Sequence, residues 1–459
     1  MLAIARHRGV RLLGGVVAAA LTGTWLQALP AEQRIMAAVF ALTVFYWITE
    51  PIPLYVTSLL AGFASAVLLG PLAPLTGAAM LDYRIFFHPF ASPVVVLMFG
   101  GFVMAQVFSQ HNLDIEFSQM VLRKLGSRPS HVLAGMMLIT AGMSMWMSNT
   151  ATTAIMVAAV LPMVRRLPPG ANMARALMLA IPFSANIGGM ATPIGTPPNA
   201  IAIGLLADQG IHISFLVWML AGFPLMMLLL GMTFLLLRLF FPIQRSHFAL
   251  EIGEEPIAAN RAIVYTVFFV TVALWVTDHV HGVPSALIAM VPVMIFSIFG
   301  LLSKKMLREI AWDILLLIGG GIALGVGIQQ TGLAESIVGA VLPPGIGAWG
   351  TMLLLGGTSA LLATFMSNTA ASNIILPLAV SVAVGLPEQI GIPVALCASL
   401  GMALPISTPP NAIAFGSELV AGKDMFRLGA VITILGVILT VAYEEMLYSL
   451  PLVLRLFGH

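Results

Sequence analysis

Long runs of apolar residues with almost no charge limit what this chain can fold into. The run from Leu225 to Leu237 is almost entirely apolar, and a helix needs about 20 such residues to cross the hydrocarbon core of a bilayer. Only 8% of the 459 residues are charged, whereas a soluble domain carries about a quarter. We therefore predict an integral membrane protein embedded in a lipid bilayer, and we exclude a soluble globule or a nucleic-acid binder.

Hydropathy predicts an all-α polytopic protein with about 11 transmembrane helices. These fall near residues 12–29, 35–49, 53–71, 92–108, 176–205, 214–240, 263–281, 284–302, 312–329, 389–420 and 427–449. Two further apolar stretches, 131–165 and 348–382, are too long for one span, and a polar triplet interrupts each near its middle. We interpret both as re-entrant hairpins, which enter and leave the membrane on the same side.

The positions of the basic residues support this topology. With a cytoplasmic N-terminus and two re-entrant hairpins, all but three of the 20 Lys and Arg residues lie on the cytoplasmic side; the exceptions are Arg34, Arg84 and Arg455. Short cytoplasmic loops collect Lys and Arg. If 131–165 were instead a single crossing, the cations before it and after it would lie on opposite sides. The sequence thus predicts a multi-pass protein of the inner membrane.

Two pairs of polar motifs recur in the same order and indicate an internal repeat. The triplet SNT occupies Ser148–Thr150 and again Ser367–Thr369, while GTPPNAIA begins at Gly195 and STPPNAIA at Ser407. An odd number of predicted crossings separates the two halves, so their topologies are inverted. Inverted repeats with interrupted helices are the architecture of secondary transporters, whose sites lie near the middle of the membrane.

The repeated motifs break helices in the membrane and supply uncharged ligands. Each Pro-Pro pair, at 197–198 and 409–410, removes amide hydrogens and bars the preceding helical turn. The free N–H groups at a helix start favour an anion, and Ser, Asn and Thr oxygens suit a hard cation. The broken motifs contain no acid, whereas proton relays use Asp, Glu or His. The pattern therefore favours a cation-coupled carrier of an anion.

Four features of the sequence point in the same direction: the paired SNT motifs, the paired TPPN motifs, the segment SANIGGMATPIGTPPNAIA at Ser184–Ala202 and the segment LLLIGGG at Leu315–Gly321. With these features the chain resembles the divalent anion/sodium symporters, the INDY-type dicarboxylate carriers. The resemblance covers nearly the whole chain. It implies a homodimeric elevator transporter that imports C4 dicarboxylates such as succinate, malate or fumarate together with Na+. Scaffold spans and arms would comprise 1–130 and 246–345, with an arm near 111–124. The transport domain would comprise 131–245 and 346–459.

The resemblance also implies the residues of the binding sites. The first sodium site would comprise Ser144, Ser148, Asn149 and the carbonyl of Gly195. The second would comprise position Ala363, Asn368 and the carbonyls near Met366 and Ser407. The substrate carboxylates would meet Asn149, Thr150 and Thr196 in the first half, and Ser367, Asn368, Thr369, Thr408 and Pro409 in the second.

One departure from the family pattern bears on cation coupling. Family members commonly have Thr where this chain has Ala363, and an acid is frequent where it has Thr364. The second cation site thus loses a side-chain oxygen, unless Thr364 or a water replaces it.

The alternative function is a proton-coupled or exchange-type carrier of di- or tricarboxylates or sulfate. A channel would need a continuous pore, and an enzyme would need paired catalytic acids, which the sequence does not offer.

Overall fold

The structure is a computed structural model that describes residues 2–116, 128–168, 170–242, 260–343, 345–382 and 386–451. Within these ranges every regular element is a helix. The predicted arm near 111–124 lies largely outside the described residues. The predicted all-α class is confirmed.

The described part of the first half contains long helices and several short ones. Before the first polar triplet come α1 (Leu2–Trp25), α2 (Ala31–Thr49), α3 (Leu54–Leu68), α4 (Ala73–Thr76), η1 (Tyr83–Phe86), η2 (His88–Ala91) and α5 (Pro93–Gln110). The rest of this half comprises α7 (Pro129–Ser144), α8 (Asn149–Val164), α9 (Asn172–Gly188), η3 (Gly189–Ala191), α10 (Pro197–Asp208) and α11 (Phe215–Phe240).

The second half repeats this order. It begins with α12 (Arg261–Val276), α13 (Asp278–His281), α14 (Ser285–Ile288), α15 (Met290–Ile298), α16 (Lys304–Arg308), α17 (Trp312–Gln330) and α18 (Leu333–Val341). It continues with α19 (Ala348–Phe365), α20 (Asn368–Ala379), α21 (Pro387–Ala398), α22 (Pro409–Gly416) and α23 (Gly422–Tyr448).

The helix breaks predicted at the polar motifs are confirmed in both halves. The stretch 131–165 forms α7 and α8, which are interrupted before Asn149, and the stretch 348–382 forms α19 and α20, which are interrupted before Asn368. Both Pro-Pro pairs stand at the first two positions of a helix, in α10 and α22. Proline is favoured there because its missing N–H would have no helical partner.

Five helical segments are long and apolar enough to cross a membrane. They are His88–Gln110, Phe215–Phe240, Lys304–Gln330, Ala348–Phe365 and Gly422–Tyr448 among the described residues. Four shorter apolar segments join them, at Leu54–Leu68, Asn149–Val164, Arg261–Val276 and Ser285–Ile298. These segments support a multi-pass membrane protein, while the count of about 11 spans stays a prediction.

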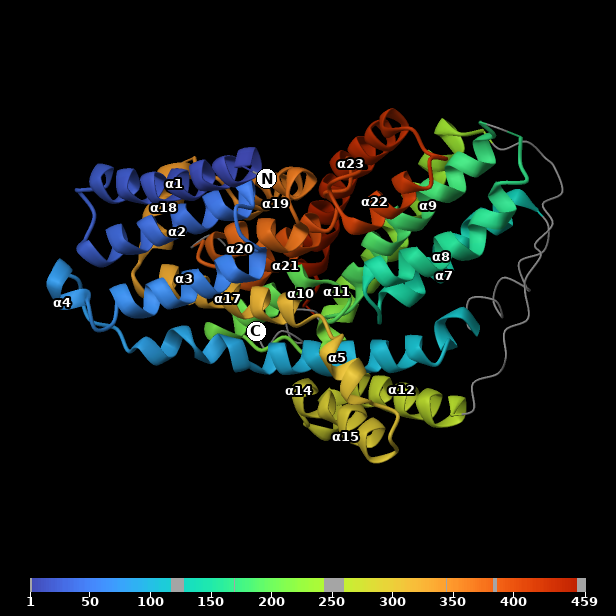
Figure 1. The fold of residues 1–459 in the computed structure, drawn as a ribbon, viewed down its shortest axis with the longest axis horizontal. Helices are drawn as coiled ribbons and strands as arrows, with labels where there is room; N and C mark the ends of the chain where they lie inside the picture. The colour runs from blue at the N-terminus through green and yellow to red at the C-terminus, as the bar shows by residue number, and fades with distance from the viewer. Residues whose placement is uncertain are drawn as a thin grey trace.

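One long helix of each half packs on the other half. Helix α5 lies against α14 and α15, and α17 lies against α3 (Figure 1). Glycine permits both approaches: a Cβ on Gly100 would overlap the backbone of Ala289, and a Cβ on Gly320 would overlap Ser58. Gly100 and Gly320 therefore permit close helix packing.

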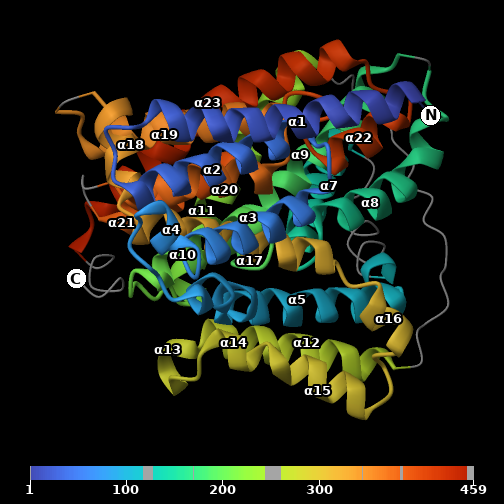
Figure 2. The same ribbon diagram turned by 60° about the vertical axis from the view of Figure 1, so that its left-hand side comes forward.

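The interrupted helices of the two halves interlock in the same manner. Helix α8 of the first half packs on α22 of the second, and α20 of the second half packs on α10 of the first. In Figure 2 the N-terminus and α16 lie at one end of the long helices, and α13, α18 and the C-terminus lie at the other. Because of this interlocking, neither half can form the central packing alone.

Candidate functional site

The first polar break forms a compact group of oxygen atoms. Helix α7 ends at Ser144, which is fully buried, and its hydroxyl donates a hydrogen bond of 2.6 Å to Oδ1 of Asn149, the first residue of α8. A Cβ atom on Gly189 would lie 2.7 Å from this Oδ1 and 2.9 Å from the carbonyl oxygen of Gly195. Two predicted sodium ligands, Oδ1 of Asn149 and the carbonyl oxygen of Gly195, therefore lie on the same side of Gly189, and the Ser144 hydroxyl is bonded to the first of them. Neutral oxygens of this kind suit a hard cation.

Two side chains of the interrupted helix hold the first break in place. Thr192, in the loop between η3 and α10, donates a hydrogen bond to the carbonyl of Met145 in the break. The amide of Asn199 donates to the carbonyl oxygens of Gly189 at 3.0 Å and Thr192 at 2.7 Å. These bonds satisfy backbone carbonyls that the interrupted helix leaves free, as an apolar surrounding requires.

The second break lacks the hydroxyl of the first. Ala363, which aligns with Ser144, is fully buried, and its Cβ faces Gly401. The Thr364 hydroxyl donates to the carbonyl of Ala360 in its own helix at 2.9 Å. Asn368 begins α20, and its Oδ1 is buried with no hydrogen-bond partner among the described residues. The second break therefore offers one unused amide oxygen.

The loop around the second Pro-Pro pair repeats the bonds of the first. The amide of Asn411 donates to the carbonyls of Met402 at 2.8 Å and Leu404 at 2.9 Å, as Asn199 does in the first half. The Ser407 hydroxyl donates to the carbonyl of Thr364 at 2.6 Å and so joins this loop to the second hairpin. Ser407 thus serves as a structural link in addition to its predicted role through its carbonyl.

Asn186 connects the two halves, and our reading of the sequence did not single it out. This buried residue of α9 donates to Oγ1 of Thr408 at 3.2 Å and contacts Oδ1 of Asn411 at 3.5 Å. Asn186 lies inside the segment that resembles the symporters, but it belongs to neither repeated motif. Its bridging role depends on how the halves meet, which a repeat within one chain does not reveal.

The remaining predicted substrate residues lie at or next to helix starts. Thr196 precedes α10 and Thr408 precedes α22, and both are buried; Thr150 and Thr369 lie in the first turns of α8 and α20. Ser367 accepts a hydrogen bond from the backbone N–H of Ala370 and so caps α20. Ser148 and Pro409 are exposed. Four helices, α8, α10, α20 and α22, begin at the repeated motifs, and helix starts favour anions.

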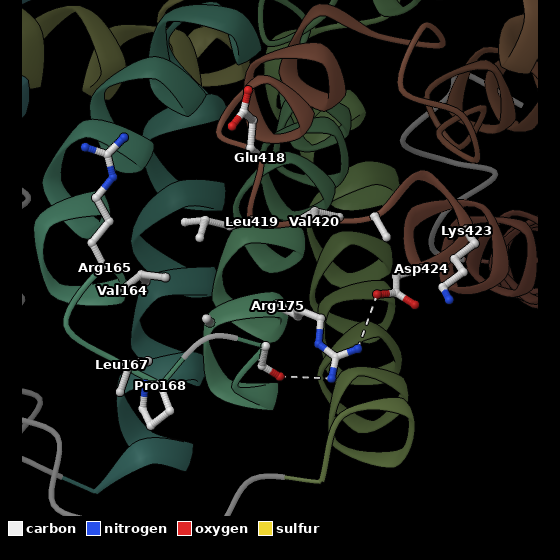
Figure 3. A pocket seen from close by; sticks show the side chains of 13 residues that line it. Val164, Arg165, Leu167, Pro168, Arg175, Glu418, Leu419, Val420, Lys423 and Asp424 are labelled. Atoms are coloured by element: carbon white, nitrogen blue, oxygen red, sulfur yellow. Dashed lines mark hydrogen bonds and ion pairs between the residues drawn. The ribbon is translucent and has the colours of Figure 1, made fainter.

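A cavity of about 620 Å³ lies away from these breaks, between the end of α8 and the start of α23 (Figure 3). Arg175 projects into it and contacts Asp424 at 3.4 Å and the carbonyl of Gly170 at 3.1 Å. The basic and acidic side chains that line it are Arg165, Arg175, Glu418, Lys423 and Asp424. None of the predicted site residues lines this cavity, so it is distinct from the candidate site.

Comparisons with known proteins agree with this architecture. A protein-family model described as a citrate transporter matches residues 44–391. The chain is 30% identical, over 93% of its length and 88% of the relative, to a protein named sodium-dependent dicarboxylate transporter SdcS from Staphylococcus aureus (strain bovine RF122 / ET3-1). The protein of the same name from strain USA300 is 29% identical over the same shares.

Two solved transporters share the fold. The Alcanivorax borkumensis YdaH transporter superposes with a TM-score of 0.56 at 14% identity, covering 86% of this chain and 98% of that one. Neisseria gonorrhoeae MtrF superposes with a TM-score of 0.53 at 11% identity, covering 92% and 96%. The family match and the relatives agree with the repeated motifs, so the chain is a membrane transporter rather than an enzyme and belongs to the divalent anion/sodium symporter family.

Proposed function

We propose that this protein is a sodium-coupled symporter that imports C4 dicarboxylates such as succinate across the inner membrane. The observation that carries the proposal is the first break, where Oδ1 of Asn149 lies near the carbonyl oxygen of Gly195 and accepts a hydrogen bond from Ser144. Relatives named as sodium-dependent dicarboxylate transporters support both the cation and the substrate class. Sodium at the two breaks would supply the positive charge that these uncharged loops lack.

Binding begins with sodium in this proposal. A cation beside Gly189 orders the break between α7 and α8, and a second cation at Asn368 orders the break between α19 and α20. The dianion then binds between the two breaks, with its carboxylates near the starts of α8 and α20, whose free N–H groups favour negative charge. Two sodium ions neutralise the dianion, so the loaded domain carries little net charge into the apolar phase.

The loaded site then crosses the membrane by an elevator movement. We assign the hairpins and interrupted helices to the moving domain, in the parts 131–245 and 346–459, and the remaining parts to a scaffold that forms a homodimer. Helix α10 packs on α5 and α17 through Gly204, and α17 receives Leu205 against Gly325. Each glycine accommodates a side chain of the facing helix, Ile322 at Gly204 and Leu205 at Gly325, so these contacts would separate when the domain moves. The N-terminus lies in the cytoplasm in this arrangement.

Uptake by proteoliposomes tests the proposed coupling. With an inward sodium gradient we expect uptake of labelled succinate at least about tenfold faster than with choline at the same pH, because an empty cation site weakens dianion binding by more than about 1.4 kcal/mol. Protein-free liposomes provide the background. Equal uptake in sodium and choline would contradict sodium coupling and would favour the proton-coupled or exchange-type alternative.

Ala363 gives a second prediction about coupling. We expect Ala363→Ser to lower the sodium concentration for half-maximal uptake by about threefold, because an added hydroxyl supplies about 0.6 kcal/mol at the second cation site. Ser is the residue at the aligned position 144. The sodium dependence of succinate uptake measures the effect, and Ala412→Ser on the exposed surface of α22 is the control. An unchanged sodium dependence would show that the second cation does not bind beside position 363.

A further inference from the structure

Two fully buried glutamates lie outside the site described above. Glu388 is in the first turn of α21, and Glu444 is near the end of α23; the exposed fraction of each is 0%. Helices α21 and α23 pack against each other. Figure 2 shows both helices. Helix α23 is apolar enough to span a membrane, so Glu444 is an acid inside a candidate span.

Glu444 has no counter-charge among the described residues. Within them neither of its carboxylate oxygens has a hydrogen-bond partner, and none of the ion pairs includes it. The basic residues of α23, Lys423 and Arg427, lie in the first two turns of the helix, at its opposite end.

The groups that face Glu444 from neighbouring helices are neutral or acidic. Cys397 of α21 and the tyrosines Tyr443 and Tyr448 of α23 lie within electrostatic range of it, and Tyr448 is also within range of Glu388. The Tyr443 hydroxyl donates to the carbonyl of Leu220 in α11. Helix α19, which also packs on α23, contains no titratable side chain, and the one charged residue of α11 is in its last turn.

An ionised carboxylate in these surroundings would destabilise the fold, because burying the charge without a cation has a free-energy cost of several kcal/mol or more. The neutral acid avoids this cost with one bound proton. A metal ion would need several oxygen ligands, and the described residues contain no group of three His, Cys, Asp or Glu side chains placed to hold one. The surroundings of Glu444 therefore suit a proton rather than a metal ion.

We propose that Glu444 is a proton-binding site carried by the moving domain, separate from the sodium and substrate site. The assignment to a moving domain rests on the proposed function. Thr433 of α23 donates to the carbonyl of Leu400, where the second interrupted helix breaks, and the helix from Thr433 to Glu444 rises about 16 Å further. The proton therefore acts on the packing of α23 against α21 and not on the ligands of the cations. Loss of the proton would weaken this packing and slow the movement of the domain across the membrane.

Thermal unfolding of the purified protein at a series of pH values tests the site directly. The folded state holds the proton that the exposed glutamate of the unfolded chain releases, so the stability of the wild type should fall as the pH rises. We expect the unfolding temperature of the wild type to fall between pH 6 and pH 9, and that of Glu444→Gln, which is neutral at every pH, to fall by less. Glu445→Gln is the matched control, since Glu445 is only half-buried and contacts Gln389.

Succinate uptake at fixed sodium supplies the functional readout. Over the same pH range we expect wild-type uptake to slow about tenfold, while Glu444→Gln keeps its rate. If Glu444→Gln does not fold, Glu444→Met keeps the volume and carries the same expectation. A Glu444→Gln protein with the pH response of the wild type in both measurements would overturn the proposal. Failure of wild-type transport would contradict the proposed function, but the unfolding series would still test the proton site.

Discussion

Replacing both Asn149 and Asn368 by Ala is expected to reduce sodium-driven succinate uptake by about a thousandfold. Oδ1 of Asn149 accepts a hydrogen bond from the Ser144 hydroxyl and lies beside Gly189, and Asn368 has a buried Oδ1 with no partner among the described residues. Each amide oxygen that contacts a cation or orders a ligand contributes about 2 kcal/mol. Two such losses, one at each helix break, add to about 4 kcal/mol, which corresponds to about a thousandfold in uptake rate.

The experiment compares the double variant with each single variant in proteoliposomes. The uptake rate of each single variant should fall about thirtyfold, because the break that is not substituted keeps its own cation ligands. Asn260→Ala is the control, since Asn260 is exposed at the start of α12 and its side chain makes no capping bond. Normal elution of the variants on gel filtration would show that the fold persists. Substantial uptake by the double variant would place the site elsewhere in the molecule.

Gly189→Ala is expected to weaken sodium binding by about a hundredfold, or about 2.7 kcal/mol. The new Cβ would lie 2.7 Å from Oδ1 of Asn149 and 2.9 Å from the carbonyl oxygen of Gly195, which is too close for either atom, so these two predicted sodium ligands would have to shift. Gly189 has an ordinary helical φ of −59°, so the substitution adds no backbone strain. The effect would therefore come from the filled space alone.

Sodium-dependent thermal stabilisation measures this effect without transport. A ligand that binds the folded state raises the unfolding temperature in proportion to the logarithm of its concentration over its Kd. The wild type should become more stable with added sodium, and Gly189→Ala should respond only at much higher concentrations. Gly142→Ala is the control because it lies in α7 of the same hairpin with open space around its Cβ position. An unchanged sodium response in Gly189→Ala would exclude a cation at this point.

Most of the local structure of the site was predictable from the chain because it depends on nearby residues. Proline lacks an amide hydrogen wherever it stands, so the Pro-Pro pair at 197–198 marks a helix start without further information. The repetition of SNT and TPPN indicated which polar residues work together. The pairing of Ser144 with Asn149 also joins residues of one hairpin, across a single break.

The contacts between halves were not predictable in the same way. Asn186 reaches Thr408 and Asn411, which are more than 200 residues away, and no periodic pattern connects them. The placement of Glu388 beside the end of α23 likewise requires α21 and α23 to pack, since the two acids stand on different helices.

The sequence by itself determined that the chain spans a membrane, that it consists of two related halves, and that uncharged polar motifs interrupt its helices. These properties follow from hydrophobicity and from backbone chemistry, which act within one or two helical turns. Only the tertiary structure decided that α8 packs on α22 and α20 on α10, that two oxygens lie on one side of Gly189, and that Glu444 is buried without a hydrogen-bond partner among the described residues. Those features depend on side-chain shape at contacts between distant segments, where packing, rather than local preference, selects the arrangement.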